Sequence, residues 1–313
     1  MSADRGGLVA AWYRGAWWLW LLRPLEFLFR AIAATRRALY RFGVLGVYRA
    51  SRPVVVVGNI TVGGTGKTPI VIALVEALQQ RGLSPGVVSR GYGASGTVFP
   101  HTVTDQSTAA DCGDEPLLIY RRTACPCVVS PSRSEAVARL LDEFEVDVVI
   151  SDDGLQHYAL GRDMEIAVVD AKRLAGNGFC IPAGPLREPP RRLESVDYVL
   201  YRGGSDPLSG VNYRQAGLVN LVSGAQRSLA PAVVGEQVHA VAGIGQPQQF
   251  FQSLEGAGYS VEAHAFPDHH LYSPGDFAQL GDKPVIMTEK DAVKCRDFAG
   301  QYAWGQDAFY LKI

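Results

Sequence analysis

The stretch VVVVGNITVGGTGKTP, from Val54 to Pro69, decides the fold. It begins with a run of valines, which favours a buried strand, and continues into a glycine-rich loop. The loop departs at one position from the nucleotide-binding pattern G-x-x-x-x-G-K-[ST], because Thr61 stands where the pattern has its first glycine. Pro69 suits the first turn of a helix, where its missing N–H costs no hydrogen bond. The stretch therefore predicts a strand, a phosphate-binding loop and a helix.

The residue types in this loop suit the phosphates of a nucleotide. The glycines let backbone N–H groups turn inward, Lys67 reaches the β- and γ-phosphates, and the Thr68 hydroxyl binds Mg2+. The N-terminus of the following helix adds a favourable dipole for the anion. We expect the nucleotide to be bound by Thr61, Val62, Gly63, Gly64, Thr65, Gly66, Lys67 and Thr68.

A second motif, VDVVISDDGLQH, supplies the carboxylates that such a loop needs. Asp152 and Asp153 directly follow a hydrophobic strand, and an acid at that place positions Mg2+ or its waters in nucleotide-binding folds. An adjacent Asp pair can also mark a surface turn, but the strand before it favours the metal site. Guanine specificity is unsupported, because TEKD places Lys290 beside Asp291 and lacks the asparagine of N-K-x-D.

Strand and helix patterns alternate after Val54, which predicts an α/β fold with a parallel sheet covered by helices on both faces. We expect a P-loop kinase-like domain over residues 46–225. A glycine-, serine- and valine-rich stretch at residues 203–235 suggests a boundary, and a smaller C-terminal α/β domain is expected over residues 226–313. Residues 1–45 are expected to form an amphipathic helical segment.

The first 52 residues carry nine arginines against Asp4 and Glu26, so their formal charge is +7, whereas the whole chain has a charge of -1. Four of the five tryptophans lie in the same segment. Its uninterrupted apolar runs are far shorter than the roughly 20 residues of a membrane-spanning helix. We interpret it as an interfacial helix that places tryptophans among lipid headgroups and arginines on anionic lipid. A helix packed on the protein's own core is the alternative.

Composition indicates an ordinary globular protein, with 47% hydrophobic and 19% charged residues. The five cysteines are odd in number and form no C-x2-C pair, so we expect reduced, structural thiols. An export signal is disfavoured, because Arg23 and Pro24 interrupt the apolar segment and an ATP-type loop needs a cytoplasmic nucleotide.

Acid–base residues occur in GDEP, with Asp114 and Glu115 in a turn-like setting, and in FPDHHLY, with His269. Phosphoryl transfer to an alcohol benefits from a carboxylate that accepts the hydroxyl proton. An Asp and a His from these distant segments could form such a pair, although DHH could equally be a capped turn with exposed histidines.

Two further motifs offer charged contacts. PAGPLREP is a stiff loop that presents Arg187 and Glu188, a phosphate clamp and a metal-side acid. SRGYG places Arg90 near a strand end, where ligands gather in open α/β sheets. The alternative for SRGYG is a glycine-rich turn with an incidental arginine.

Seven motifs occur together and in order: GNITVGGTGKTP, SRGYG, GDEP, DDGLQH, PAGPLREP, FPDHH and TEKDAVK. In this combination the chain resembles the tetraacyldisaccharide 4'-kinase family, the lipid A kinases of Gram-negative bacteria. The resemblance covers nearly the whole chain, and it makes Thr61 the family's own variant of the loop. One position departs, because Ala94 follows SRGYG where a basic residue is common.

The resemblance implies transfer of the ATP γ-phosphate to the 4'-hydroxyl of a tetraacylated disaccharide 1-phosphate, giving lipid IVA at the cytoplasmic face of the inner membrane. The cofactors implied are ATP and Mg2+, and the partners are the lipid substrate and an anionic membrane surface, without nucleic acid. The implied roles are catalysis for Asp114 as base, His269, Lys67 and Asp153; metal binding for Thr68, Asp152, Gln156 and Glu188; and substrate contact for Arg90, Glu115 and Arg187.

His270, Thr288, Lys290 and Asp291 are implied to lie near the site without a defined role. Two other functions stay open from the residues alone. A soluble P-loop enzyme that phosphorylates or ligates a cofactor precursor would share the loop and the Asp pair. A nucleotide-gated, membrane-associated switch would share the loop and lack the base.

Overall fold

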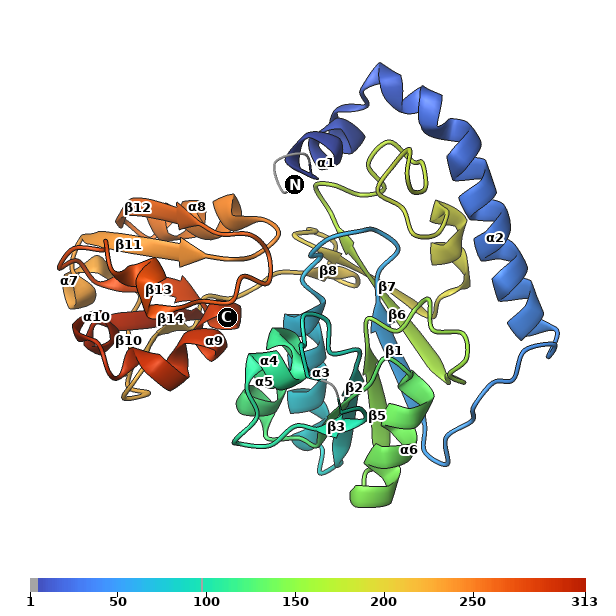
Figure 1. The fold of residues 1–313 in the computed structure, drawn as a ribbon, viewed down its shortest axis with the longest axis horizontal. Helices are drawn as coiled ribbons and strands as arrows, with labels where there is room; N and C mark the ends of the chain where they lie inside the picture. Colours follow the sequence, from blue (N-terminus) through green and yellow to red (C-terminus); the bar gives the residue numbers. More distant parts are fainter. Residues whose placement is uncertain (1–4, 97) are drawn as a thin grey trace. The chain divides into compact units, whose positions relative to one another are not determined.

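The computed structural model describes residues 5–96 and 98–313, which divide into two compact units (Figure 1). The first unit runs up to Arg90 and from Cys125 to Asn212, and the second comprises Gly91–Ala124 and Tyr213–Ile313. Each unit contains its own sheet and its own hydrophobic core. The chain therefore enters the second unit twice, first through an insertion in the first unit and again at the C-terminus.

The first unit is built on a parallel sheet. Its strands lie in the order β4-β2-β5-β1-β6-β7-β8, and the neighbouring pairs are parallel. Their bounds are β1 Val54–Gly58, β2 Pro85–Ser89, β4 Cys127–Val129, β5 Val148–Asp152, β6 Met164–Asp170, β7 Tyr198–Arg202 and β8 Gly210–Val211. From β1 the chain passes to β2 on one side, whereas β6 and β7 lie on the other. The carboxyl end of β1 is thus at a topological switch point, where open α/β sheets bind ligands.

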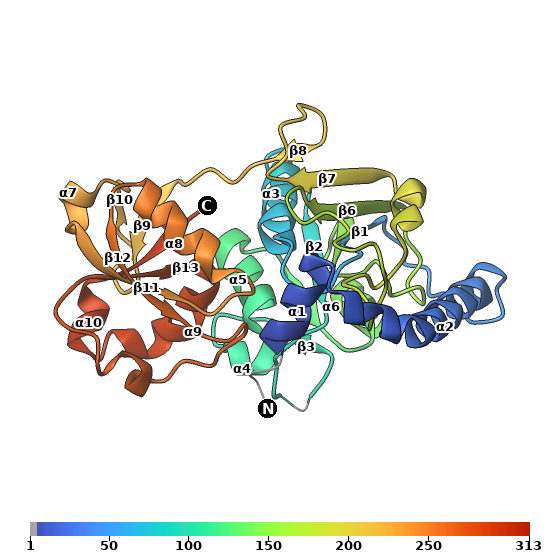
Figure 2. The ribbon, with the colours of Figure 1, turned by 90° about the horizontal axis from the view of Figure 1, so that it is seen from above.

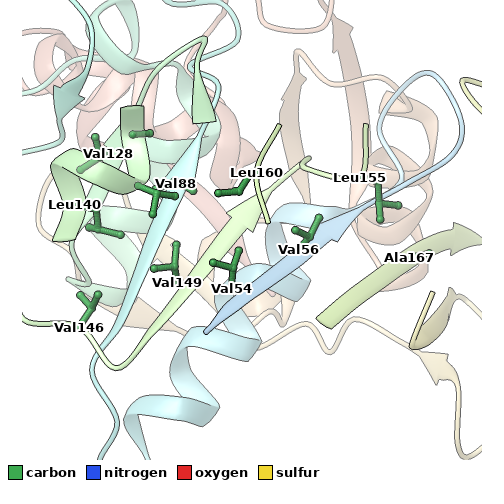
Figure 3. Packing of buried hydrophobic residues seen from close by; sticks show 12 residues of the cluster. Val54, Val56, Val88, Val128, Leu140, Val146, Val149, Leu155, Leu160 and Ala167 are labelled. Carbon is green, nitrogen blue, oxygen red and sulfur yellow. The ribbon is translucent and has the colours of Figure 1, made fainter. Parts of the chain in front are cut away.

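Two helices cover opposite faces of this sheet, α3 (Lys67–Gln79) and α6 (Arg133–Glu143) (Figure 2). The connection through α3 joins β1 to β2 and the connection through α6 joins β4 to β5, in opposite directions along the sheet. Right-handed crossovers in opposite directions place their helices on opposite faces. The face under α6 packs Val54 and Val56 of β1 against Val149 and Leu140 (Figure 3).

The N-terminal segment forms α1 (Arg5–Arg14), the 3-10 helix η1 (Trp17–Leu22) and α2 (Arg23–Arg41), the long helix of the first unit (Figure 1). Glu26 on α2 is buried, and it accepts a hydrogen bond from the backbone N–H of Cys180. Trp12 is also buried, and its Nε1 donates to the carbonyl of Pro182 at 3.0 Å. Trp12 is therefore a core residue rather than a lipid anchor. Within the described residues, no helix is both long enough and apolar enough to cross a membrane.

The second unit has a mixed sheet with the order β10-β9-β14-β13-β11-β12, in which β9 pairs antiparallel with both neighbours. Its strands are β9 Gly217–Asn220, β10 Gln226–Arg227, β11 Gln237–Ala242, β12 Ser260–Ala265, β13 Val285–Thr288 and β14 Ala308–Lys312. The remaining elements are β3 His101–Thr102, α4 Ala109–Cys112, α5 Asp114–Thr123, α7 Pro231–Val234, α8 Pro247–Gly256, η3 Pro274–Phe277, α9 Glu289–Ala299 and α10 Ala303–Gln306. Helix α8 packs Phe250, Phe251 and Leu254 on Val238 and Ala240 of β11.

The predicted α/β class with a parallel sheet in the P-loop region is confirmed, as is the second α/β unit. The turn expected at GDEP is wrong, because Asp114 and Glu115 are the first residues of α5. Pro116 fits there because a helix needs no N–H in its first turn. The five cysteines are buried, in agreement with structural thiols. The division of the chain into domains at residues 1–45, 46–225 and 226–313 stays a prediction.

Candidate active site

The phosphate loop connects β1 to α3. Gly63 and Gly66 have φ of 98° and 81°, a left-handed conformation that favours glycine. Asn59, fully buried, donates its side-chain N–H to the Thr65 hydroxyl at 3.1 Å and ties the start of the loop to its far side. Ideal Cβ atoms at Gly63 and Gly64 would meet no atom within 4 Å, so this surface of the loop is open.

Thr61 replaces the first glycine of the pattern because its backbone belongs to a short antiparallel pair. It forms a bridge with Leu186, Val62 donates to the carbonyl of Pro185 at 2.8 Å, and Arg187 donates to the carbonyl of Ile60 at 2.7 Å. Extended backbone of this kind suits a β-branched residue and requires no positive φ. The pairing also brings the PAGPLREP segment beside the loop.

Sheet register brings the Asp pair to the same edge as the loop. Val57, one residue before the end of β1, is the parallel partner of Asp152 at the end of β5. Asp152 is 1% exposed, and its Oδ2 accepts from the Ser89 hydroxyl at 3.3 Å. The backbone carbonyl of Asp152 accepts from the buried guanidinium of Arg133 at 2.7 Å. Asp153 follows with a left-handed φ of 49°, which turns its side chain out of the strand direction.

Asp153 lies between two fixed positive charges. Its carboxylate is 3.4 Å from Nζ of Lys67 and 3.0 Å from a guanidinium nitrogen of Arg187. Burial alone would raise the pKa of Asp153, but Lys67 and Arg187 outweigh it and lower the pKa to about 2. Asp153 is thus ionised across the physiological range.

The other predicted metal and substrate residues of the first unit have defined partners. Gln156 donates to the carbonyl of Asn59 at 3.1 Å, and its side-chain oxygen accepts from Arg187 at 3.4 Å. Glu188 is buried, accepts a hydrogen bond from the Tyr158 hydroxyl and pairs with Nε of Arg192 at 3.0 Å. Arg90 directly follows β2 and is exposed. Gln156 and Arg187 therefore join Lys67 and Asp153, whereas Glu188 is held by residues outside the loop.

These residues fit a nucleotide with its magnesium ion. The Thr68 hydroxyl lies in the first turn of α3, and the carboxylate of Asp152 lies at the edge where β1 ends. Hydroxyl and carboxylate oxygens are the donors that Mg2+ prefers. Lys67 and the helix N-terminus supply the positive potential that a polyphosphate requires. Thr68 and Asp152 would hold the ion, with Gln156 and Glu188 as further candidates.

The second unit contains the predicted acid–base pair. Gly113 has a φ of 88°, and a Cβ there would lie 2.7 Å from the carbonyl of Tyr92, so glycine is required where the chain enters α5. Asp114, 4% exposed, follows as the first residue of the helix. Nδ1 of His269 lies 3.0 Å from both carboxylate oxygens of Asp114. The structure thus joins two residues that are 155 positions apart in the chain.

Lysines from α9 surround this pair. Nζ of Lys290 is 3.0 Å from Glu115, 3.3 Å from Asp268 and 3.8 Å from Asp114. Lys294 lies deeper, with its Nζ 3.7 Å from Asp114 and 2.7 Å from the fully buried Asp291. The cluster brings two lysines and several acids around one carboxylate, so none of its charges is buried alone.

The surroundings shift both members of the pair toward their charged forms. Burial would raise the pKa of Asp114, but the hydrogen bond from His269 and the charge of Lys290 lower it below its usual range. Burial would lower the pKa of His269, but its hydrogen bond to Asp114 raises it above the usual value. The edge of the His269 ring contacts Tyr92, with ring centroids 4.9 Å apart. His269 itself has a left-handed φ of 62°, and the structure makes it a partner of Asp114 rather than an exposed turn residue.

Several contacts around Asp152 and around the Asp114–His269 pair are not predictable from the motifs. Asp152 is contacted by Ser89, the first residue of SRGYG, and by Arg133, which lies in none of the seven motifs. Lys290 was expected near the site without a role, and Lys294 was named only as part of TEKDAVK. Their spacing of four residues on α9 was a usable signal, because residues i and i+4 share a helix face.

Comparison with known proteins agrees with this chemistry. The family profile described as "Tetraacyldisaccharide-1-P 4'-kinase", LpxK, matches residues 18–313. A protein of Pseudomonas aeruginosa (strain LESB58) named tetraacyldisaccharide 4'-kinase is 51% identical over 300 residues, 95% of this chain and 90% of its own length. A protein of the same name from Azotobacter vinelandii is 51% identical over 305 residues, 96% of this chain and 91% of its own.

A solved structure shows the same fold. The LpxK of Aquifex aeolicus, crystallised in complex with ATP, superimposes with a TM-score of 0.77 at 27% identity, and the match covers 94% of this chain and 93% of that one. These similarities do not favour the cofactor-precursor enzyme that the loop and Asp pair left open. The chain belongs to the tetraacyldisaccharide 4'-kinase family.

Proposed function

We propose that this protein transfers the γ-phosphate of ATP to the 4'-hydroxyl of a tetraacylated glucosamine disaccharide 1-phosphate, with ATP on the first unit and Asp114 as the base for the hydroxyl. The buried Asp114–His269 pair is the observation that carries the proposal. A nucleotide switch would need the loop and the Asp pair but no carboxylate–imidazole pair.

On the nucleotide side, the loop residues Thr61 to Thr68 hold the phosphates, and Lys67 offsets the negative charge that develops on the leaving ADP. Thr68 and Asp152 would hold Mg2+, which when bound neutralises charge on the phosphate oxygens. Asp153 holds the Lys67 amine at 3.4 Å and so restricts it to the mouth of the loop. Gln156 and Glu188 are proposed to complete the metal environment.

On the acceptor side, the 4'-hydroxyl loses its proton to the Asp114–His269 pair as its oxygen bonds to the γ-phosphorus. The bond between that phosphorus and the bridging oxygen of ATP breaks, and ADP leaves. A carboxylate with a low pKa is a weak base by itself, so the neutral imidazole of His269 is needed to share the proton. Lys290 holds Glu115 and Asp268 beside the pair.

Substrate contacts are proposed for Arg90, Arg187 and Glu115. The two arginines can bind phosphate oxygens in a bidentate manner. Glu115 can accept hydrogen bonds from sugar hydroxyls while it stays paired with Lys290. The missing basic residue at Ala94 leaves Arg90 as the contact of the SRGYG segment.

Membrane attachment through the N-terminal segment is also proposed, at the cytoplasmic face of the inner membrane. Leu25, Leu28 and Ile32 are spaced for one face of α2, and Leu21 of η1 precedes them. All four side chains are 55–72% exposed, while Glu26 is buried against the protein. Trp17 and Trp20 are exposed next to this stripe. A substrate with four acyl chains stays in a bilayer, and an apolar stripe edged by arginines suits the lipid interface.

Vesicle flotation tests the membrane proposal. The exposed position of Leu28 allows Leu28→Glu without loss of core packing, and the variant should release the protein from anionic vesicles. The matched control is Leu208→Glu, since Leu208 is 96% exposed in the same unit but lies outside the stripe. Equal flotation of Leu28→Glu, Leu208→Glu and the unchanged protein would contradict attachment through this face.

The catalytic proposal is tested with labelled ATP and the disaccharide 1-phosphate in detergent micelles. Label should appear in a product that carries a second phosphate at the 4' position, and ADP formation should depend on the acceptor. Folded protein that hydrolyses ATP equally without acceptor would support a switch instead. Absence of any transfer by folded protein in the presence of Mg2+ would reject the kinase assignment.

A further inference from the structure

A cluster of potential metal ligands lies at the edge of the second sheet, on strands that contain neither Asp114 nor His269. His239 lies on β11, and Glu262 and His264 lie on the edge strand β12. In the parallel register, His239 is the partner of Glu262 and Val241 is the partner of His264. Side chains alternate along a strand, so Glu262 and His264 share a face. The ring contact between His239 and His264 puts all three on that face.

The donor atoms have the spacing of ligands around one ion. Nδ1 of His239 is 3.1 Å from Nε2 of His264 and 3.5 Å from Oε2 of Glu262. Nε2 of His264 is 3.9 Å from Oε1 of Glu262. Tetrahedral ligands at about 2.0–2.1 Å from Zn2+ lie about 3.3 Å from one another. The two histidine nitrogens already have this spacing, whereas the distances to Glu262 involve different carboxylate oxygens, so its exposed side chain must turn one oxygen toward both imidazoles.

We propose that His239, Glu262 and His264 bind a divalent first-row transition-metal ion, with Zn2+ as the best match. Two imidazoles and one carboxylate are a ligand set that Zn2+ accepts, and a water would complete the tetrahedron. The ion reaches the site from solvent, because Glu262 is exposed and His264 is partly exposed, while His239 forms the buried floor.

The surroundings of the cluster determine how tightly it can bind a metal ion. Nζ of Lys283 lies 3.1 Å from Oε2 of Glu262, and its positive charge opposes the ion. Nε2 of His239 is buried without a hydrogen-bond partner among the described residues. The hydrogen bond that usually strengthens a histidine ligand from its other ring nitrogen is therefore missing, and we expect the affinity for the ion to be about 10–100-fold lower than at a site that has this bond.

The test is a titration of the full, tag-free protein with Co2+ alone, followed by visible absorption, and then displacement by Zn2+. We expect one bound equivalent and at least about tenfold weaker binding in His264→Gln and in Glu262→Gln. Lys283→Met should bind more tightly, because it removes the opposing charge. Kinase activity of His264→Gln should be unchanged, so the result is independent of the catalytic proposal.

Two controls separate this site from others. His101→Gln removes a histidine whose Nε2 contacts the Ser107 hydroxyl, outside the cluster, and should bind Co2+ normally. His269→Gln removes a ligand from the other described group that could hold a metal, Asp114, Glu115 and His269, and should also bind normally. Binding that is lost in His269→Gln but kept in His264→Gln, or no binding by the unchanged protein, would overturn the proposal.

Discussion

Asp153 in the first unit and Asp114 in the second are both ionised carboxylates, but their partners differ in kind. Asp153 is held by the amine of Lys67 and the guanidinium of Arg187. Asp114 is held by His269, which can gain or lose its proton near neutrality. In the proposed reaction, the first arrangement supplies a positive electrostatic field for phosphates, and the second supplies the proton acceptor. The two tasks of the kinase would thus be carried by different chemistry in different units.

Lys67→Ala should have the largest effect, because it removes the fixed charge from the nucleotide side. We expect kcat/KM to fall by about 10^3–10^5-fold, with weaker ATP binding as well. Steady-state kinetics and calorimetric ATP titration would measure both. Lys283→Ala, which removes an exposed lysine of the second unit, is the matched control. Wild-type ATP affinity in Lys67→Ala would contradict our reading of the loop.

Asp114→Asn should have the next largest effect and a different pattern. The amide preserves the shape but cannot accept the proton, so kcat should fall by about 10^2–10^4-fold while ATP affinity changes little. Single-turnover kinetics would separate the chemical step from binding. If Asp114→Asn lost ATP affinity as strongly as Lys67→Ala, the division of tasks between the two units would be wrong.

The pH profile offers a third way to separate the two carboxylates. The Asp114–His269 pair can take up a proton only after His269 has lost its own, so kcat/KM should rise with pH through the raised pKa of His269. The charge of Lys290 lowers that pKa, so Lys290→Met should move the acidic limb to higher pH. Arg187→Met, made beside Asp153, should leave the limb in place. An unmoved limb in Lys290→Met would contradict the role of His269.

The contribution of His269 to the free energy of unfolding should fall as pH rises, whereas activity should rise. The raised pKa of His269 means that its stabilising contribution is full below its unfolded pKa of about 6.5 and is lost as pH rises through the higher folded value. The lowered pKa of Asp114 means that its contribution is present above an unfolded pKa of about 3.9 and is lost as pH falls through the lower folded value. The difference in unfolding temperature between the unchanged protein and His269→Gln should therefore be largest between about pH 4 and 6.5. A difference that grows above pH 8 would contradict this.

Thr61→Gly should have the smallest effect, although it restores the strict loop pattern. Thr61 has extended, bridged backbone, so a glycine adds no needed conformation, and we expect the KM for ATP to change by less than about threefold. Gly66→Ala is the variant to compare with Thr61→Gly, because the left-handed φ of 81° at Gly66 disfavours any side chain. A large gain of ATP affinity in Thr61→Gly would contradict this and would mean that Thr61 weakens ATP binding.

Much of the architecture was predictable from local pattern. The valine run, the helix after the loop and the strand before Asp152 are continuous in sequence, so periodicity and turn residues determine them. The GDEP helix was missed because its proline and glycine resemble a turn, although Gly113 only sets the entry angle of α5. Trp12 was predicted to contact the membrane with its neighbours. Its hydrogen-bond partner Pro182 is 170 positions further along the chain, so no local pattern could reveal that Trp12 is buried.

The sequence by itself determined the strand, loop and helix of the phosphate site, because those residues are adjacent and their chemistry is local. It also pointed to Asp114 and His269 as an acid–base pair, through their order among the motifs. Only the tertiary structure decided that Arg187 reaches Asp153, through the antiparallel pairing at Thr61, and that Lys290 and Lys294 surround Asp114. The same holds for His239 and His264, which meet only because β11 and β12 are neighbours. Contacts across strands depend on sheet order and register, and neither is written in any single segment of the chain.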